Sequence, residues 1–302
     1  MNFIYWLQQM RTPLGEAVFS VITHFGSDIM MIMALCAFLW IFGRRAALRL
    51  AISYAGTGLV NQLLKIIFAV PRPWVLDDRI VPAQSAVKGA HGYSFPSGHS
   101  QTAACIFTTI AMYFRRKWLT ITCAVLVAAV MLSRMYLGVH TPWDVLTGCI
   151  VSLILTIIIN RLLDRAEHSV NYIRYTFIVG VAASVVMVGI TIAKALGGAA
   201  SAESTKSLCE VAGMTLGFVS GLYIDARTPE TRLPYRVSIP MFILGIGVVI
   251  ALRALLSAIL GKLPGLLWQD FVRYALVTAY ITGVHPAIMR GVAQHVHDAK
   301  RA

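Results

Sequence analysis

Charged side chains are scarce in this sequence of 302 residues, and acidic ones are the scarcest. Asp and Glu together number 13, and all charged residues make up 13% of the chain, whereas soluble domains usually carry about 25%. Hydrophobic residues make up 58%, and the mean hydropathy is +0.72. This composition excludes an intrinsically disordered chain, because such chains have few apolar residues and a high charge. It also disfavours a soluble globular protein.

Cysteine is rare as well, and its five positions do not form a pattern typical of disulfide or metal sites. All five lie inside apolar segments, without a CxxC pair or a set of histidines nearby. We therefore expect buried hydrophobic side chains with no role as ligands. The sequence predicts neither a metal site nor a cofactor. The residues concerned are Cys36, Cys105, Cys123, Cys149 and Cys209.

Long apolar runs, in contrast, are abundant. Residues 175–193, for example, contain no Asp, Glu, Lys or Arg. Because a helix needs about 20 predominantly apolar residues to cross a bilayer, such runs predict an integral membrane protein. We expect an all-α, polytopic transmembrane helical bundle of about nine spans. The predicted spans are 27–43, 46–69, 98–114, 118–135, 142–162, 172–196, 208–224, 237–260 and 267–289.

The residues before the first predicted span have a different pattern. Residues 1–26 mix apolar and polar positions at helical spacing and contain Pro13. This is typical of an amphipathic helix that lies in the membrane interface and is broken at the proline. The predicted organisation is therefore an interfacial segment over 1–26, a first membrane domain over 27–170, and additional transmembrane helices over 171–302.

The chain has a large basic excess, with 26 Lys and Arg residues and a formal net charge of +13. In a soluble protein such an excess would suggest a nucleic-acid partner. Here the loops predicted on one side of the membrane carry 14 Lys and Arg residues and those on the other side carry 6. The positive-inside rule makes the first side cytoplasmic, with the N-terminus outside and the C-terminus in the cytoplasm. Topology thus explains most of the charge, and no nucleic-acid partner is expected.

Three basic residues lie at helix ends on the opposite, extracytoplasmic side: Lys65, Arg72 and Arg134. Lys65 and Arg72 are seven residues apart, about two helical turns, so they can face the same way. Taken singly, Lys65 can extend toward the interface and Arg72 can be a solvated loop charge. Taken together, three cations on one face are typical of a clamp for a phosphoryl group.

Two further groups lie on the same side. One predicted helix begins at Ser97-Gly98-His99, where free backbone N–H groups suit an anion. His140 and Asp144 are four residues apart across another helix start, so the carboxylate can accept a hydrogen bond from one ring nitrogen. The other nitrogen is then available as nucleophile or base. Each group alone also fits a plain helix cap with an incidental histidine, but the combination describes metal-free phosphoryl transfer.

These residues also resemble a known family, the type 2 phosphatidic acid phosphatases. The family pattern is K-x6-R-P, then P-S-G-H, then S-R-x5-H-x3-D, and all three parts match in order over roughly residues 46–162. The matching residues are Lys65, Arg72-Pro73, Pro96-Ser97-Gly98-His99, Ser133-Arg134, His140 and Asp144.

The resemblance implies a role for each matched residue. His140 would form a phosphohistidine, Asp144 would orient it, and His99 would protonate the leaving oxygen. Phosphate oxygens would be bound by Lys65, Arg72, Arg134, Ser97 and the backbone N–H of Gly98. It also implies a metal-independent reaction without a cofactor, a helical catalytic core within 27–170, and a site at the extracytoplasmic surface.

The expected function is hydrolysis of a lipid phosphate or diphosphate within the bilayer, with substrates of the phosphatidate, phosphatidylglycerophosphate, undecaprenyl diphosphate or sphingoid phosphate class. The expected location is the inner membrane of a bacterium. One alternative is a glucose-6-phosphatase-like enzyme that acts on a soluble phosphate ester. Another is a lipid transporter or scaffold with a residual phosphatase core. A haloperoxidase, the soluble branch of the wider group, is disfavoured.

The C-terminal part carries one further pattern, the glycines of a GxxxGxxxG run at Gly213, Gly217 and Gly221. Small residues at this spacing let two helix backbones approach closely. The run predicts either packing within the chain or self-association into a homo-oligomer through this face.

Overall fold

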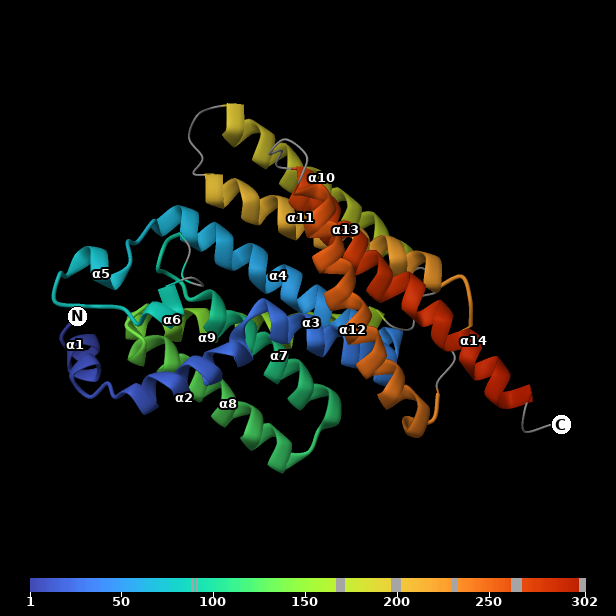
Figure 1. Cartoon of the computed structure of the whole chain (residues 1–302), viewed down its shortest axis with the longest axis horizontal. Helices are drawn as coiled ribbons and strands as arrows, with labels where there is room; N and C mark the ends of the chain where they lie inside the picture. The colour runs from blue at the N-terminus through green and yellow to red at the C-terminus, as the bar shows by residue number, and fades with distance from the viewer. Residues whose placement is uncertain are drawn as a thin grey trace. The chain divides into compact units, whose positions relative to one another are not determined.

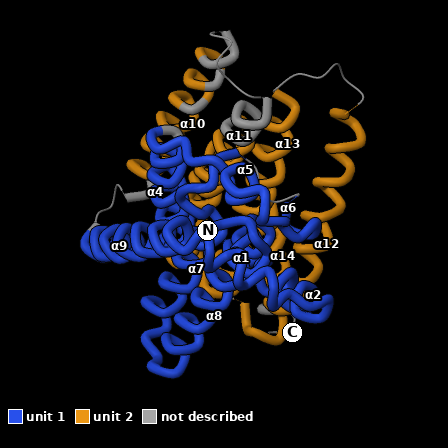
Figure 2. Tube along the Cα trace, turned by 90° about the vertical axis from the view of Figure 1, so that its left-hand side faces the viewer, with its two compact units in different colours: residues 1–35, 48–165 blue, residues 36–47, 166–302 orange. Residues whose placement is uncertain are grey.

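The computed structural model describes residues 1–87, 90, 92–166, 172–196, 202–229, 233–261 and 268–298. Within these ranges the regular secondary structure is entirely helical. The predicted all-α class is thus confirmed. The chain divides into two compact units, residues 1–35 with 48–165, and residues 36–47 with 166–302 (Figure 2). The second unit therefore also takes in a short stretch from within the predicted first membrane domain.

The first unit begins with two short helices, separated just before Pro13 as the sequence predicts. Pro13 opens the second of them, and the Thr12 side chain caps it by accepting a hydrogen bond from the Gly15 backbone N–H at 3.0 Å. The helices of this unit are α1 (Asn2–Gln9), α2 (Pro13–Thr23), the 3₁₀ turn η1 (His24–Gly26), the start of α3 (Asp28–Ala37), most of α4 (Arg44–Phe68), α5 (Pro73–Leu76), α6 (Gln84–Val87), α7 (Gly98–Phe114), α8 (Lys117–Tyr136) and α9 (Pro142–Ala166).

Helices α4, α7 and α9 are joined by buried polar side chains. The Gln101 side-chain amide donates to Thr57 Oγ1 at 2.7 Å, and the Asn160 amide donates to Ser53 Oγ at 3.0 Å. The Ser152 hydroxyl donates to the Gln101 carbonyl at 2.8 Å. Such bonds hold helices together where a bilayer offers no other partner. They fix the ends of α4, α7 and α9 relative to one another within this unit.

The start of α7 lies directly against α9. The Ser97 backbone N–H donates to the Asp144 carbonyl at 2.9 Å. A Cβ added at Gly148 would lie 2.6 Å from the Ser97 carbonyl oxygen, so only glycine allows this approach. Helices α7 and α8 run side by side as a hairpin (Figure 1). The loops that follow α4 and α8 and the starts of α7 and α9 thus meet at one end of the unit.

The second unit is built from long helices in which α11 packs against both α10 and α13 (Figure 1). Its elements are the π-helical turn η2 (Phe38–Phe42), α10 (Tyr172–Leu196), α11 (Ala202–Asp225), α12 (Tyr235–Leu260), α13 (Trp268–Ala279), the π-helical turn η3 (Tyr280–Val284) and α14 (His285–Asp298). The span predicted at 267–289 is therefore continued by η3 into a longer helical stretch.

The glycine run of α11 faces helix α13 and turn η3 of the same chain. A Cβ added at Gly213 would lie 2.2 Å from the Phe271 carbonyl oxygen, and one at Gly217 would lie 2.1 Å from that of Ala275. At Gly221 the nearest atom, 2.1 Å away, would belong to η3. The glycine run thus packs within the chain at this face, while the oligomeric state of the protein stays a prediction.

Residues from loops predicted to be cytoplasmic meet in each unit. In the first unit Arg49 Nη2 lies 2.6 Å from Asp164 Oδ1. In the second unit the buried carboxylate of Asp225 binds Arg44 Nη2 at 2.7 Å and also pairs with Arg290. Residues assigned to one side of the membrane are thus in contact within each unit, while the topology itself stays a prediction.

Three described helices are long and apolar enough to cross a membrane: 117–136, 142–165 and 235–260, with mean hydropathies of 1.8, 2.1 and 2.5. A fourth candidate is the pair 13–26 and 28–42, which is bent by 51°. The multi-pass membrane class is supported, while the number of nine spans stays a prediction. Helix α4 is long enough, but it carries several basic residues, and α7 has only 17 residues.

Candidate active site

The carboxylate of Asp144 lies in the first turn of α9 and is almost completely buried. Its Oδ2 accepts a hydrogen bond from the Ser94 hydroxyl at 2.6 Å and from the Thr141 backbone N–H at 2.7 Å. The same oxygen lies 3.4 Å from Nδ1 of His140, as the four-residue spacing predicts. Three donors from two loops and a helix start thus converge on one carboxylate oxygen.

The other ring nitrogen of His140 faces an arginine. Arg72 Nη1 lies 2.9 Å from His140 Nε2, and because a guanidinium can only donate, Nε2 accepts. The proton of the neutral ring is therefore on Nδ1, on the side of Asp144. This leaves the Nε2 lone pair as the nucleophilic position of the imidazole.

The electrostatic surroundings keep His140 neutral. Burial lowers its pKa well below the ordinary value, and the positive charges of Arg72, Arg134 and Lys65 lower it further. Burial also lowers the pKa of Arg72, to about 10, against the opposing effect of Asp144. At neutral pH the site thus combines an uncharged imidazole with a charged guanidinium, which are the forms that nucleophilic attack on a phosphoryl group requires.

Arg72 is held by the backbone of the loops around it. Helix α4 ends at Phe68, so Arg72 lies in the loop after it and not on the helix with Lys65. Its Nε donates to the Gly92 carbonyl at 3.0 Å and its Nη1 to the Val139 carbonyl at 3.1 Å. Lys65 and Arg72 therefore do not share a helix face as the seven-residue spacing predicts. The loop nevertheless brings Arg72 to the same histidine as Lys65, because both charges act on His140.

Arg134, in the last turn of α8, is 1% exposed. Its Nη1 donates to Thr23 Oγ1 at 3.0 Å, while Nε and Nη2 are buried without a hydrogen-bond partner among the described residues. A buried donor left without a partner costs about 1–3 kcal/mol, and more when it is charged. These N–H groups therefore fit an oxyanion, which would supply the missing acceptors.

The start of α7 offers backbone donors next to these cations. Ser97 is the N-cap, and its Oγ accepts from the Ser100 backbone N–H at 3.4 Å. A Cβ added at Gly98 would meet no atom within 4 Å, so the helix start borders open space at this point. His99 is half-buried and lies in the electrostatic surroundings of His140 and Arg134. Exposed N–H groups at a helix start are suited to bind a phosphate.

The structure thus brings together all eight residues singled out from the sequence, within one unit. It adds two that sequence reasoning missed, Ser94 and Thr23. Ser94 lies in the polar loop before α7, where no spacing rule marks it. Thr23 lies in the N-terminal segment, 111 residues from its partner Arg134, so no local pattern connects the two.

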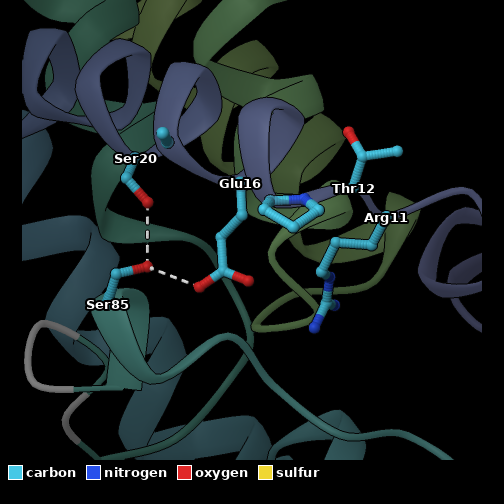
Figure 3. Close-up of a pocket in the computed structure, with 7 residues that line it drawn as sticks. Arg11, Thr12, Glu16, Ser20 and Ser85 are labelled. Atoms are coloured by element: carbon cyan, nitrogen blue, oxygen red, sulfur yellow. Dashed lines mark hydrogen bonds between the residues drawn. The ribbon is translucent and has the colours of Figure 1, made fainter.

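A separate open pocket of about 620 Å³ lies along α2, where this helix faces Ser85 of α6 (Figure 3). In it Ser20 Oγ and Ser85 Oγ are 2.8 Å apart, and the Ser85 hydroxyl donates to Glu16 at 3.4 Å. The residues that line it are Arg11, Thr12, Pro13, Glu16, Ala17, Ser20 and Ser85. None of the eight predicted site residues lines this pocket, so it is distinct from the cluster around His140.

Comparison with known families accounts for both halves of the chain. Residues 46–168 match the model of the PAP2 superfamily, and residues 209–294 match that of the PAP2 superfamily phosphatase, transmembrane extension. The chain belongs to the PAP2 superfamily. The family resemblance stated from the three motifs is confirmed, as is the expected class of membrane phosphatase. The first match contains all eight site residues. It begins two residues after the start of α4, the helix that carries Lys65.

Curated relatives of this PAP2 protein are membrane-lipid phosphatases by name. Phosphatidylglycerophosphatase B of Bacillus subtilis is 29% identical over 172 residues, which is 53% of this chain and 80% of the relative. Undecaprenyl-diphosphatase BcrC of the same organism is 29% identical over 140 residues, 45% of this chain and 69% of the relative. A crystal structure of a transmembrane PAP2 type phosphatidylglycerolphosphate phosphatase from Bacillus subtilis has a TM-score of 0.47 at 25% identity and covers 55% of this chain and 85% of that one.

Proposed function

We propose that this PAP2 protein hydrolyses a lipid phosphate or diphosphate at the extracytoplasmic face of a bacterial inner membrane. The observation that carries the proposal is the buried, neutral His140 together with Arg134, whose Nε and Nη2 have no acceptor among the residues that the structure describes. A nucleophile and cationic N–H donors in one place suit phosphoryl transfer.

In the first step Arg72 transfers its hydrogen bond from Nε2 of His140 to a phosphoryl oxygen, which frees the Nε2 lone pair to attack phosphorus. An N–P bond forms as the bond from phosphorus to the ester oxygen breaks. Asp144 retains the hydrogen bond from Nδ1–H and so stabilises the positive charge that develops on the ring. His99 enters the step as an imidazolium, gives its extra proton to the leaving oxygen and becomes neutral. The side chains of Lys65 and Arg72 balance charge on the phosphoryl oxygens.

The remaining phosphate contacts come from Arg134, the Ser97 hydroxyl and the Gly98 backbone N–H. In the second step water attacks the phosphohistidine, His99 accepts a proton from that water, and the N–P bond breaks to release inorganic phosphate. Every proton and charge in both steps is handled by groups of this chain, so the proposed reaction needs neither a metal nor a cofactor.

A lipid substrate is supported by the relatives, whose names specify phosphatidylglycerophosphate and undecaprenyl diphosphate. The proposed topology has nine spans, an N-terminus outside and a cytoplasmic C-terminus. Residues 27–170 would form the catalytic core, residues 171–302 additional transmembrane helices, and residues 1–26 an interfacial segment. The contact between Arg49 and Asp164 supports the placement of their two loops on the same side of the membrane, and the larger number of Lys and Arg residues in the loops of that side supports its cytoplasmic location.

The test is phosphate release by the full chain in detergent with EDTA present. The substrate panel contains phosphatidate, phosphatidylglycerophosphate, undecaprenyl diphosphate, sphingosine 1-phosphate and glucose 6-phosphate. We expect turnover of at least one lipid and loss of activity in His140→Asn. Dependence on added metal, or full activity in that variant, would refute the mechanism. Preference for glucose 6-phosphate would establish the soluble-ester alternative.

A further inference from the structure

The N-terminal helices reach the proposed site directly. Thr23, the last residue of α2, accepts through Oγ1 the hydrogen bond from Arg134 Nη1 at 3.0 Å, and it is only 6% exposed. Within the described residues this is the only hydrogen bond of the Arg134 guanidinium. The region that matches the PAP2 model begins at residue 46, so this partner lies outside the matched catalytic region.

Several contacts hold α2 and η1 in this place. A Cβ added at Gly26 would lie 2.4 Å from the His99 carbonyl oxygen, so η1 packs against the start of α7. Arg11 Nη2 donates to the Tyr136 carbonyl at 3.0 Å, and the rings of Phe19 and Tyr136 are 4.3 Å apart. The position of the Thr23 hydroxyl is therefore set by packing of α2 and η1 against the start of α7 and the end of α8.

The hydrogen bond to Thr23 determines which edge of the Arg134 guanidinium stays available for a ligand. The group is planar, and Nε and Nη2 form one of its edges, the edge that can bind an oxyanion with two parallel hydrogen bonds. An acceptor on Nη1 fixes the plane and leaves that edge free. We propose that Thr23 is a positioning residue for Arg134, and that the N-terminal helices are thereby a functional part of the phosphate clamp.

This inference rests on the proposed function in that Arg134 binds the substrate phosphate. Thr23→Val keeps the size of the side chain and removes the acceptor, whereas Thr23→Ser restores it. Thr122→Val is the matched control, because Thr122 is exposed on α8 and its hydroxyl bonds the Trp118 carbonyl of its own helix. Thr23→Ala serves as the second variant if the valine variant does not fold.

Two quantities would be measured on the full chain in detergent: the inhibition constant of inorganic phosphate against the lipid that turns over fastest, and the rise in melting temperature caused by inorganic phosphate. For Thr23→Val we expect the inhibition constant to rise roughly tenfold or more, which corresponds to about 1.4 kcal/mol or more, because Arg134 loses the hydrogen bond that holds its plane. The stabilisation by phosphate should shrink in parallel. Thr23→Ser should be close to wild type and Thr122→Val unchanged.

A Thr23→Val protein that binds phosphate as the wild type does would overturn the inference, even if its melting temperature is lower. A loss that Thr23→Ser does not restore would also count against it. If the wild type hydrolyses none of the panel but its phosphate binding still depends on Thr23, the proposed function fails and the positioning role stands. If the wild type does not bind phosphate at all, both fail.

Discussion

The Oγ of Ser94 lies 2.6 Å from Oδ2 of Asp144, the carboxylate oxygen that also faces Nδ1 of His140. Ser94 is completely buried, and its backbone N–H donates to the Val70 carbonyl at 2.8 Å. The hydroxyl is therefore held by the loop that also carries Arg72. Through this bond the carboxylate that orients the proposed nucleophile is fixed by a loop as well as by its own helix.

Removing this hydroxyl should slow the chemical step. For Ser94→Ala we expect kcat to fall about tenfold with KM nearly unchanged, because the carboxylate loses a charge-assisted hydrogen bond worth about 1.5–3 kcal/mol. Steady-state kinetics on the lipid substrate would measure this. Ser20→Ala, which removes a hydroxyl from the separate pocket, is the control and should leave kcat unchanged. A fall in kcat of the same size in the control would argue against a specific role for Ser94.

Acid should destabilise the protein through His140. The pKa of His140 in the folded protein lies below its ordinary value of about 6.5. At a pH between these two values the unfolded chain therefore binds a proton at this histidine that the folded protein does not bind. The stability due to the neutral ring is complete above that ordinary value and decreases as the pH falls below it. Melting temperatures between pH 7.5 and pH 5 should therefore drop less steeply for His140→Gln than for the wild type. The exposed His24 provides the control variant, His24→Gln, whose curve should follow the wild type.

Arg134 is expected to trade stability for function. Two nitrogens of its buried guanidinium have no partner in the described part of the chain, and the group lies in the same cationic surroundings as Arg72 and Lys65. Arg134→Met should raise the melting temperature without phosphate, since an uncompensated buried charge is removed. The same variant should lose at least about a hundredfold in kcat/KM, the usual effect of deleting an oxyanion donor. A melting temperature below that of the wild type would show that the guanidinium stabilises the fold.

The glycine face of α11 permits a test of packing in the second unit. Gly217→Ala would place a Cβ 2.1 Å from the Ala275 carbonyl oxygen, and such overpacking typically costs about 1–3 kcal/mol. Gly247→Ala is the matched control, because nothing lies within 4 Å of its added Cβ on helix α12. We expect a lower melting temperature for the first variant and no decrease for the second. Equal melting temperatures would mean that α13 does not pack on this face.

The motif residues could be assigned from the sequence because their relationships are local. His140 and Asp144 are four residues apart, and the N-cap role of Ser97 follows from its place before a predicted helix. Residues at such short spacings lie close together in space regardless of how the rest of the chain folds. The apolar composition likewise indicated membrane helices, since a bilayer admits few other structures for such a chain.

The relationships over long sequence distances became known only from the tertiary structure. The glycine run was compatible with packing inside the chain or with self-association, and the position of α13 against α11 selects the first. Helices such as α4 carry basic residues, so apolar length alone does not mark them as spans. Fewer described helices than the nine predicted spans are long and apolar enough to cross a membrane.

By itself, then, the sequence determined the helical membrane class, the PAP2 family and the eight residues of the proposed site. The tertiary structure decided the partners of those residues: Ser94 on the carboxylate, Thr23 on Arg134, and the Arg72 guanidinium on Nε2 of His140. The physical reason is that a hydrogen bond depends on the distance between two atoms in space. For residues as far apart as Thr23 and Arg134, that distance is set by how the helices pack and not by any local spacing.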